Sequence, residues 1–161
     1  MAAVDYFLTI TGVQGESQDD THRDEIEVLS WSWGETQPGA AAAGGGGAAK
    51  VQMQDLHFTT STSRASPKLM LACASGQHLA EAQLTCRRAG KAQQEFLKVT
   101  LTDVVVSSFQ TGGSAAGDLL PVDQVSLAFG KIEIEYREQR SNGTLGPPIR
   151  AGWDVKKNRK V

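Results

Sequence analysis

Alternation of apolar and polar residues runs through much of this chain of 161 residues, and it constrains the fold more than any other feature. The longest alternating run covers residues 124–136, and two others cover residues 80–87 and 96–107. Because successive side chains of a β-strand point to opposite faces, a period of two predicts strands with one covered face. Shorter strand signals lie at residues 5–10, 25–33, 51–60 and 151–155.

Two of these predicted strands change phase along their length. In residues 124–136 the apolar side chains move from odd to even positions at Gly130, which predicts a bulge or a barrel corner there. In residues 25–33 the phase changes near Val28. The apolar side chains before and after a phase change point to opposite faces, so a strand needs a bulge or two covered faces to bury all of them. The later set of apolar side chains, expected on one face, consists of Leu29, Trp31 and Trp33.

One segment carries a helix signal. Ser66 before Pro67 predicts an N-cap followed by the first helical residue, and Gly76 is the expected C-cap, so the helix spans about two turns. Its predicted apolar side consists of Leu69, Met70, Cys73 and Ala74. Seven or eight strands, one short helix and no regular strand–helix alternation predict a mainly β fold, as a small antiparallel barrel or sandwich.

A segment rich in glycine and alanine interrupts the strand pattern. Residues 38–50 include four consecutive alanines and four consecutive glycines, and they show no periodicity. This excursion is too long for an ordinary hairpin turn and offers almost no side chains for packing. We therefore expect a long flexible loop here.

The length and charge of the chain limit the number of domains and the kinds of partner that we expect. The chain suits one domain, residues 1–161, with no effector domain after the last strand. A formal net charge of −2 argues against nucleic-acid binding, and no apolar stretch is long enough to insert in a membrane. Asp5 lies where a signal peptide would have its basic and apolar regions, so export would not use a cleaved signal.

Motifs for catalysis or cofactor binding are missing from the sequence. The glycine run lacks the Gly-Lys-Ser/Thr ending of a phosphate loop, and no nucleophile elbow or zinc-protease motif occurs. The acidic stretch 16–25 lacks the central glycine of a calcium loop and is expected to be solvated. Cys73 and His78 could pair as nucleophile and base, but a cysteine on an apolar helix face usually packs in the core, as Cys86 should in its strand. We expect no enzyme activity, no metal and no cofactor.

Short motifs spread over the whole chain, in order, resemble those of the Hcp proteins of type VI secretion. Each motif is weak alone, and their combination is specific. They lie at residues 15–17, 22, 25–26, 31–34, 54–56, 66–69, 72–76, 106–108, 111–114, 130–132 and 152–154.

This resemblance implies a small antiparallel β-barrel with one short α-helix and a long Gly/Ala-rich loop. It also implies a structural subunit of which six copies close into a ring, with rings stacking into the inner tube of the secretion machine. The implied partners are further copies of the chain, a VgrG-type spike, a contractile sheath and small secreted effectors that ride in the ring lumen. The protein would be made in the cytoplasm and then secreted without a cleaved signal peptide.

Candidate contact residues follow from alternation and from the resemblance. If the tryptophans enter the core, Ser30 and Ser32 point away from it, and Ser32 becomes a candidate for the lumen and for effector binding. The resemblance makes Ser114 a second candidate. An interface or outer-wall position for Ser32 remains equally open. The resemblance also suggests ring contacts for the glycines of the loop, which are Gly44, Gly45, Gly46 and Gly47.

A different class of function stays open at this point. Two indoles on one strand face, Trp31 and Trp33, could form a stacking platform for a ligand. The alternative is therefore a β-barrel module that binds a small ligand or an oligosaccharide, although core packing is the commoner use of such side chains.

Overall fold

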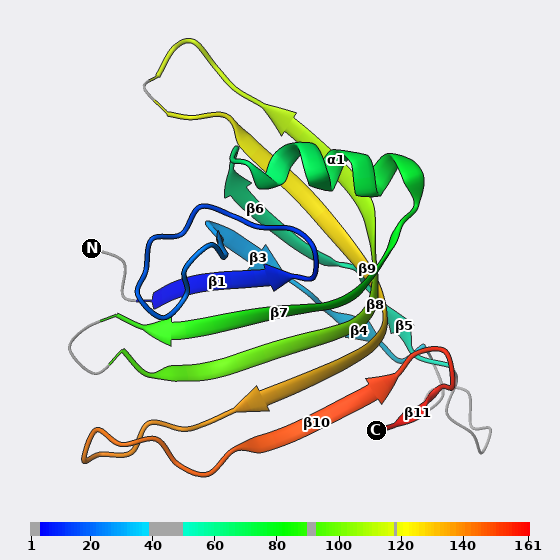
Figure 1. Cartoon of the computed structure of the whole chain (residues 1–161). Helices are drawn as coiled ribbons and strands as arrows, with labels where there is room; N and C mark the ends of the chain where they lie inside the picture. The colour runs from blue at the N-terminus through cyan, green and yellow to red at the C-terminus, as the bar shows by residue number, and fades with distance from the viewer. Residues whose placement is uncertain (1–3, 39–49, 90–92, 118) are drawn as a thin grey trace.

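The computed structural model describes residues 4–38, 50–89, 93–117 and 119–161. These residues form one helix, α1 (Ala65–Ser75), and a set of antiparallel strands (Figure 1). The strands are β1 (Val4–Ile10), β2 (Ile26–Glu27), β3 (Ser30–Ser32), β4 (Glu35–Thr36), β5 (Gln52–Met53), β6 (Leu56–Ser61), β7 (His78–Arg88), β8 (Glu95–Gly112), β9 (Val122–Tyr136), β10 (Ile149–Asp154) and β11 (Arg159–Lys160).

The strands pair in an antiparallel manner throughout and confirm the predicted mainly β fold. Pairing runs from β1 through β7, β8 and β9 to β6 and then β3. The consecutive strands β2 and β3 join the two ends, because Glu27 pairs with Phe7 of β1 and Ser30 pairs with Thr59 of β6. The C-terminal half of β9 pairs instead with β10, which carries β11 on its outer side.

The phase change of the long strands occurs where it was predicted, but Gly130 makes no bulge. Pairing of β8 with β9 keeps its register on both sides of Gly130, and the register shifts between Val106 and Ser108. Asp103, opposite Gly130, has a positive φ of 56°. A Cβ atom at Gly130 would lie 3.3 Å from a carboxylate oxygen of Asp103, so the glycine allows this close approach.

The chain between β2 and β3 also corrects an expectation. Val28 is buried and donates its N–H to the carbonyl of Tyr6 in β1, whereas Leu29 donates to the carbonyl of Thr59 in β6. The chain thus passes from one strand neighbour to another at this point. Leu29, expected in the core with the tryptophans, is 58% exposed as a result.

Helix α1 is longer than predicted and begins differently. It has 11 residues, and Arg64, not Ser66, precedes it without a capping side chain. The hydroxyl of Ser66 instead donates to the buried carboxylate of Asp123 on β9. Gly76 ends the helix with a φ of 66°, as predicted, because glycine tolerates the left-handed conformation.

The predicted apolar side of α1 was only partly correct. Leu69 and Ala72 are buried and Cys73 is partly buried, but Met70 is 50% exposed and Ala74 is also exposed. One face of α1 therefore packs on the barrel beside β8 (Figure 1), and the opposite face carries apolar side chains into solvent.

Residues 16–25 are only in part the solvated acidic loop that was expected, because Glu16, Asp20 and Asp24 are exposed whereas His22 is buried. Arg87 of β7, 3% exposed, binds both Asp19 and Asp5. His22 is 6% exposed, and its ring stacks on the ring of Phe7 with the centroids 4.3 Å apart. Each of its ring nitrogens lies within hydrogen-bond distance of a carboxylate. Those carboxylates belong to Glu25, at 2.9 Å, and Glu95, at 2.7 Å. Contacts of the buried Arg87 and His22 side chains with partly exposed carboxylates therefore hold this loop against the barrel.

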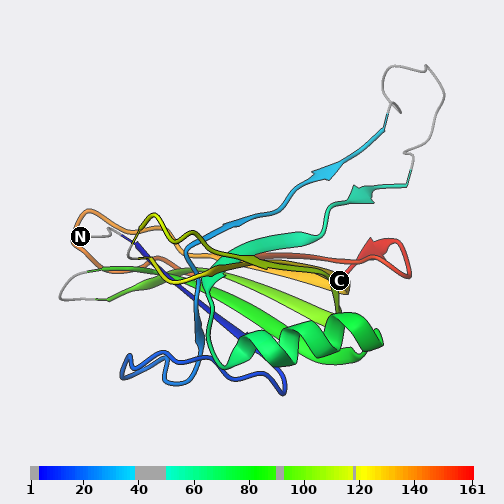
Figure 2. The ribbon, with the colours of Figure 1, turned by 90° about the horizontal axis from the view of Figure 1, so that it is seen from above.

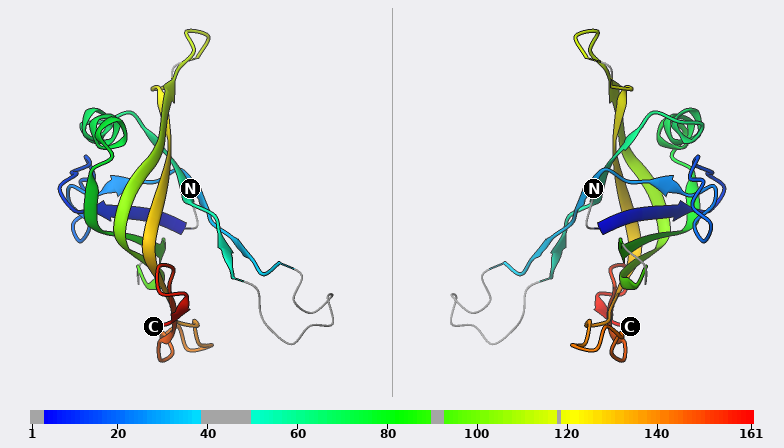
Figure 3. Two further views of the ribbon diagram at one scale, coloured as in Figure 1. Left: turned by 90° about the vertical axis from the view of Figure 1, so that its right-hand side faces the viewer. Right: turned by 90° about the vertical axis from the view of Figure 1, so that its left-hand side faces the viewer.

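Two hairpins extend from the barrel. The hairpin of β4 and β5 leads away from the body (Figures 2 and 3). The hairpin of β8 and β9 rises beyond α1 at the other side (Figure 1). Of the predicted loop 38–50, residues 39–49 lie outside the described residues.

Candidate functional site

Strands β3, β6, β9 and the distal half of β8 form a four-stranded sheet with one polar outer face. We call this the polar sheet face. Its side chains are short hydroxyls, amides and one imidazole, and they are exposed or half-buried. It consists of Ser30, Ser32, His57, Thr59, Ser108, Gln110, Gln124 and Ser126.

Strand register places these residues in rows. One row runs Ser32, His57, Ser126 and Ser108, and the next runs Ser30, Thr59, Gln124 and Gln110. Directly paired residues of antiparallel strands point to the same face, so each row is continuous across the sheet. Hydrogen bonds join neighbours within the rows, from the Ser30 hydroxyl to Thr59 at 2.6 Å and from His57 to Ser126 at 3.1 Å.

The row between them points to the core. It consists of Trp31, Phe58, Val125 and Phe109. Phe58 and Val125 are fully buried, and the two outer members are partly buried against the same core. The opposite face therefore stays outside, with no large apolar side chain in either polar row.

Among the described residues, this sheet has an edge without a ladder partner on each side. Pairing of β7 with β8 ends at Val105, although β8 continues to Gly112. On the other side, β3 has β6 as its only ladder partner among the described residues. Unpaired backbone N–H and C=O groups at such edges favour pairing with another chain.

The structure places the predicted site residues in different regions. Ser32 is exposed and lies in the polar sheet face, pointing away from the core as alternation predicted. Ser114 lies beyond the end of β8, where its hydroxyl accepts a hydrogen bond from the N–H of Ala116 at 3.2 Å. It belongs to the hairpin tip and not to the face. The four loop glycines, Gly44 to Gly47, lie outside the described residues.

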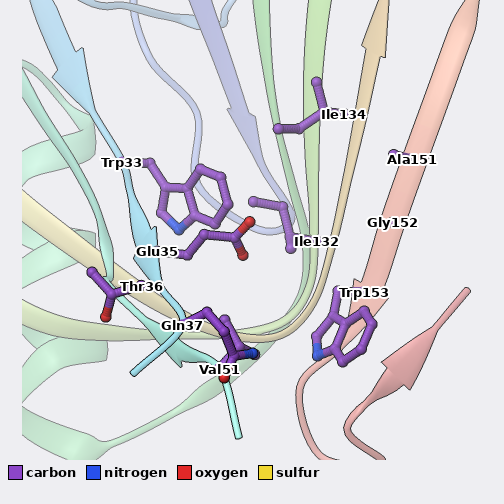
Figure 4. Close-up of a pocket in the computed structure, with 10 residues that line it drawn as sticks. All are labelled: Trp33, Glu35, Thr36, Gln37, Val51, Ile132, Ile134, Ala151, Gly152 and Trp153. Atoms are coloured by element: carbon purple, nitrogen blue, oxygen red, sulfur yellow. The ribbon is translucent and has the colours of Figure 1, made fainter. Parts of the chain in front are cut away.

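A groove of about 550 Å³ opens where β4 and β5 leave the barrel (Figure 4). Two indoles, Trp33 and Trp153, line it, with Ile132 of β9 between them and Ile134 farther along the same strand. The buried Nε1 atoms of both indoles lack a hydrogen-bond acceptor within the described part of the chain. Because both Nε1 atoms are buried in the wall, the open space of the groove is lined mainly by apolar side chains.

The indoles of the predicted stacking platform have separate neighbours. Trp31 meets Tyr6 edge-on, with ring centroids 6.3 Å apart, and Trp33 lies 6.5 Å from Phe129. Both are partly buried against the core. They therefore do not present one joint surface to a ligand, and Trp33 shares its groove with Trp153 instead.

The titratable groups of the barrel serve mainly in ion pairs. Hydrogen bonds from Lys156 and then His78 hold the pKa of Asp103 below its ordinary value. His78 is thus engaged with a carboxylate and not with a thiol. Burial raises the pKa of Cys86 to about 12, whereas Cys73 is only partly buried. Within the described ranges, no three His, Cys, Asp or Glu side chains gather as metal ligands.

Sequence reasoning missed most of the polar sheet face and the groove. The signal for the face was present in the alternation of Gln124 and Ser126 with buried Val125 and Leu127. Alternation within a strand did not indicate which strands lie next to one another in the sheet. The partnership of Trp33 with Trp153 had no local signal, because these residues are far apart in the chain.

Comparison with known proteins agrees with this geometry. Residues 7–136 match the family described as "Type VI secretion system effector, Hcp". Protein hcp1 of Pseudomonas aeruginosa is 46% identical over 159 residues, covering 97% of this chain and 98% of that protein. No helix among the described residues has the length and apolar character required to span a membrane.

Solved structures show the same fold. Hcp1 from Salmonella typhimurium is 38% identical with a TM-score of 0.83, covering 99% of this chain and 100% of that one. A type six secretion system protein of 31% identity reaches a TM-score of 0.92 with the same coverage. A type VI secretion system effector from Yersinia pestis, also 31% identical, has a TM-score of 0.76 and covers 94% of this chain and 100% of its own.

Proposed function

Because this chain belongs to the Hcp family of type VI secretion proteins, we propose that it is a structural subunit of the inner tube, closing into hexameric rings that stack. The observation that carries the proposal is the four-stranded sheet, which within the described part of the chain has an edge without a ladder partner on each side. One edge belongs to β3 and the other to the distal half of β8. An edge of one copy can pair with the opposite edge of the next.

Such pairing is head-to-tail and uses two different surfaces of each copy. Contacts of this kind produce a closed ring if the rotation between neighbours closes, and an open filament if it does not. Closure also protects every edge strand from uncontrolled pairing. The number six comes from the family and not from the geometry.

In this ring the polar sheet face lines the lumen and carries secreted effectors. A channel that passes varied cargo needs short polar groups, because large apolar patches would retain passengers. Ser32 lies in one of the two polar rows, which makes it the stronger of the two candidate cargo contacts. Ser114, at the hairpin tip, is the second. In the competing arrangement, Ser32 lies at an interface between subunits.

The hairpin of β4 and β5 contacts neighbouring subunits or the next ring. It leaves the barrel body in the direction seen in Figures 2 and 3, and the loop with Gly44 to Gly47 connects its strands. The remaining partners follow from the family: a VgrG-type spike at the tip of the tube and a contractile sheath around it. The protein acts without enzymatic activity and leaves the cytoplasm with the machine.

Native mass spectrometry and electron microscopy of the purified protein test this proposal. We expect a closed oligomer of six subunits at micromolar concentration and ring-shaped particles with a central hole. A monomer at every concentration and salt tested would refute the tube function. Rings of another number would refute only the hexamer.

A further inference from the structure

His22 is a buried titratable side chain that the proposed tube function does not use. Only 6% of the residue is exposed, and its ring stacks on the ring of Phe7 with an interplanar angle of 6°. Its Nδ1 atom lies 2.9 Å from a carboxylate oxygen of Glu25 in the same loop. Its Nε2 atom lies 2.7 Å from a carboxylate oxygen of Glu95, at the start of β8. One imidazole thus joins the loop of residues 16–25 to the barrel.

The number of protons on the ring follows from these two contacts. A carboxylate can only accept hydrogen bonds, whereas a neutral imidazole has one N–H donor and one nitrogen that can only accept. A neutral His22 would therefore place the lone pair of one nitrogen against an oxygen of Glu25 or Glu95. Both contacts are hydrogen bonds only if each contains a proton. They then join a cation to two anions, and such charge-assisted hydrogen bonds are about twice as strong as neutral ones.

The second proton belongs on the imidazole and not on either carboxyl group. In water a glutamic acid releases its proton at about pH 4.3 and an imidazolium at about pH 6.5, so the ring holds the proton more firmly. Lys98 also favours the ionised form of Glu95, because its Nζ atom lies 3.5 Å from the other carboxylate oxygen of that residue.

The other charged groups around the ring do not oppose this charge strongly. Arg87 of β7 lies over the aromatic ring on which His22 stacks, but its guanidinium binds the carboxylates of Asp5 and Asp19. Two carboxylates in direct contact with His22 therefore outweigh a cation that has carboxylate partners of its own. Solvent and salt screen the exposed charged side chains of the loop, which include Asp20, Arg23 and Asp24.

We propose that His22 carries two ring protons in the folded protein at neutral pH, that it fastens the loop of residues 16–25 to the barrel through Glu25 and Glu95, and that the loop opens as the pH rises. Loss of one proton replaces a charge-assisted hydrogen bond by the contact of a lone pair with a carboxylate. In the unfolded chain the ring loses this proton at about pH 6.5, so the stabilisation is fully present below that value. It is lost as the pH rises through the value at which folded His22 deprotonates. The device lies within a single copy and does not depend on the proposed ring.

The nitrogen NMR spectrum of protein that contains isotope-labelled histidine tests the charge of the ring directly. The chain has three histidines, so His57→Gln and His78→Gln assign the signals by difference. At about pH 7.5, one unit above the ordinary imidazole value, we expect both nitrogens of His22 to be protonated. His57 is the internal reference and should have one bare nitrogen, because its Nδ1 atom lies 3.1 Å from the hydroxyl of Ser126. A bare nitrogen on His22 at this pH would overturn the proposal.

Trypsin cleavage of the native protein measures the opening of the loop. Arg23 is exposed within the loop, and Arg140, exposed beside the turn that precedes β10, is a reference site in the same chain. The deprotonated fraction of a group grows about tenfold per pH unit until half of it has lost its proton. Between about pH 7.5 and about pH 9.5, we therefore expect the ratio of cleavage after Arg23 to cleavage after Arg140 to rise about tenfold or more.

Two variants show whether the carboxylates control this opening. Glu95→Gln removes one of the two anions that hold the imidazolium, so the raised cleavage ratio should appear already at about pH 7.5. Glu135→Gln is the matched control, because it makes the same change at another partly exposed carboxylate of the sheet, and it should leave the ratio unchanged. A ratio that does not respond to pH, or equal ratios in both variants and the unchanged protein, would overturn the proposal.

Discussion

Arg87 donates hydrogen bonds to both carboxylate oxygens of Asp19, at 2.9 and 2.7 Å, from a side chain that is only 4% exposed. The same guanidinium reaches Asp5 at 3.1 Å and lies over the ring of Phe7. These contacts join the loop of residues 16–25 to β1 and β7. Removal of the guanidinium would leave two carboxylates without their cation.

Arg87→Gln should lower the free energy of unfolding by about 3 kcal/mol, because it breaks a largely buried ion-pair network. Chemical denaturation followed by tryptophan fluorescence measures this change. Arg150→Gln is the matched control, since Arg150 pairs with Glu135 while its side chain is 60% exposed. The control should lose no more than about 1 kcal/mol. Equal losses would show that burial of the network contributes nothing.

The same pair predicts a dependence of stability on acid. The hydrogen bonds from Arg87 hold the pKa of Asp19 well below its ordinary value of 3.8. A carboxylate whose pKa is lowered by folding stabilises the folded protein at pH values above its unfolded-state pKa of about 3.9. This stabilisation is lost as the pH falls below that value. The melting temperature should therefore fall less steeply below pH 4 in Asp19→Asn than in the unchanged protein. Parallel curves for both proteins would contradict this.

Ser66 ties α1 to the barrel and does not cap the helix. It donates to Asp123, which is fully buried and also accepts from Thr62 at 2.9 Å. Ser66→Ala should cost about 1–3 kcal/mol, because the carboxylate loses a donor, while the helical circular dichroism of the folded protein stays unchanged. Ser75→Ala, at the exposed end of the helix, is the control. Loss of helical signal without loss of stability would favour the capping role.

Ser32 should influence cargo without affecting assembly. Ser32→Gln enlarges an exposed side chain in the polar sheet face, so rings should persist in native mass spectrometry while a co-expressed effector co-purifies less. Ser141→Gln, in an exposed turn before β10, is the control and should retain cargo. Loss of the ring would instead assign Ser32 to a subunit interface.

The two thiols should react at different rates. Burial raises the pKa of Cys86 to about 12, so this thiol stays protonated and inaccessible at pH 8. Cys73 on α1 is only partly buried and should react first. Thiol titration of the native protein should find one reactive group, with the second appearing on denaturation. Simultaneous reaction of both before unfolding would contradict the burial of Cys86.

Local features of the fold were predictable from the sequence. Alternation identified the strands because the period of two is a property of each strand alone. Gly76 ended the helix as expected, since its left-handed conformation depends on the residue itself. Ser32 was expected to point outward for the same reason, and it does. These conclusions need only the geometry of a few consecutive residues.

The tertiary structure decided how distant segments meet. Leu29 is exposed because the chain changes its pairing partner from β1 to β6 there. Ser66 donates a hydrogen bond to Asp123 because β9 passes beside the start of α1. The rows of the polar sheet face and the pairing of Trp33 with Trp153 likewise join residues far apart in sequence. Strand order, register and burial are set by packing of the whole barrel, and alternation within one strand carries no information about its neighbours.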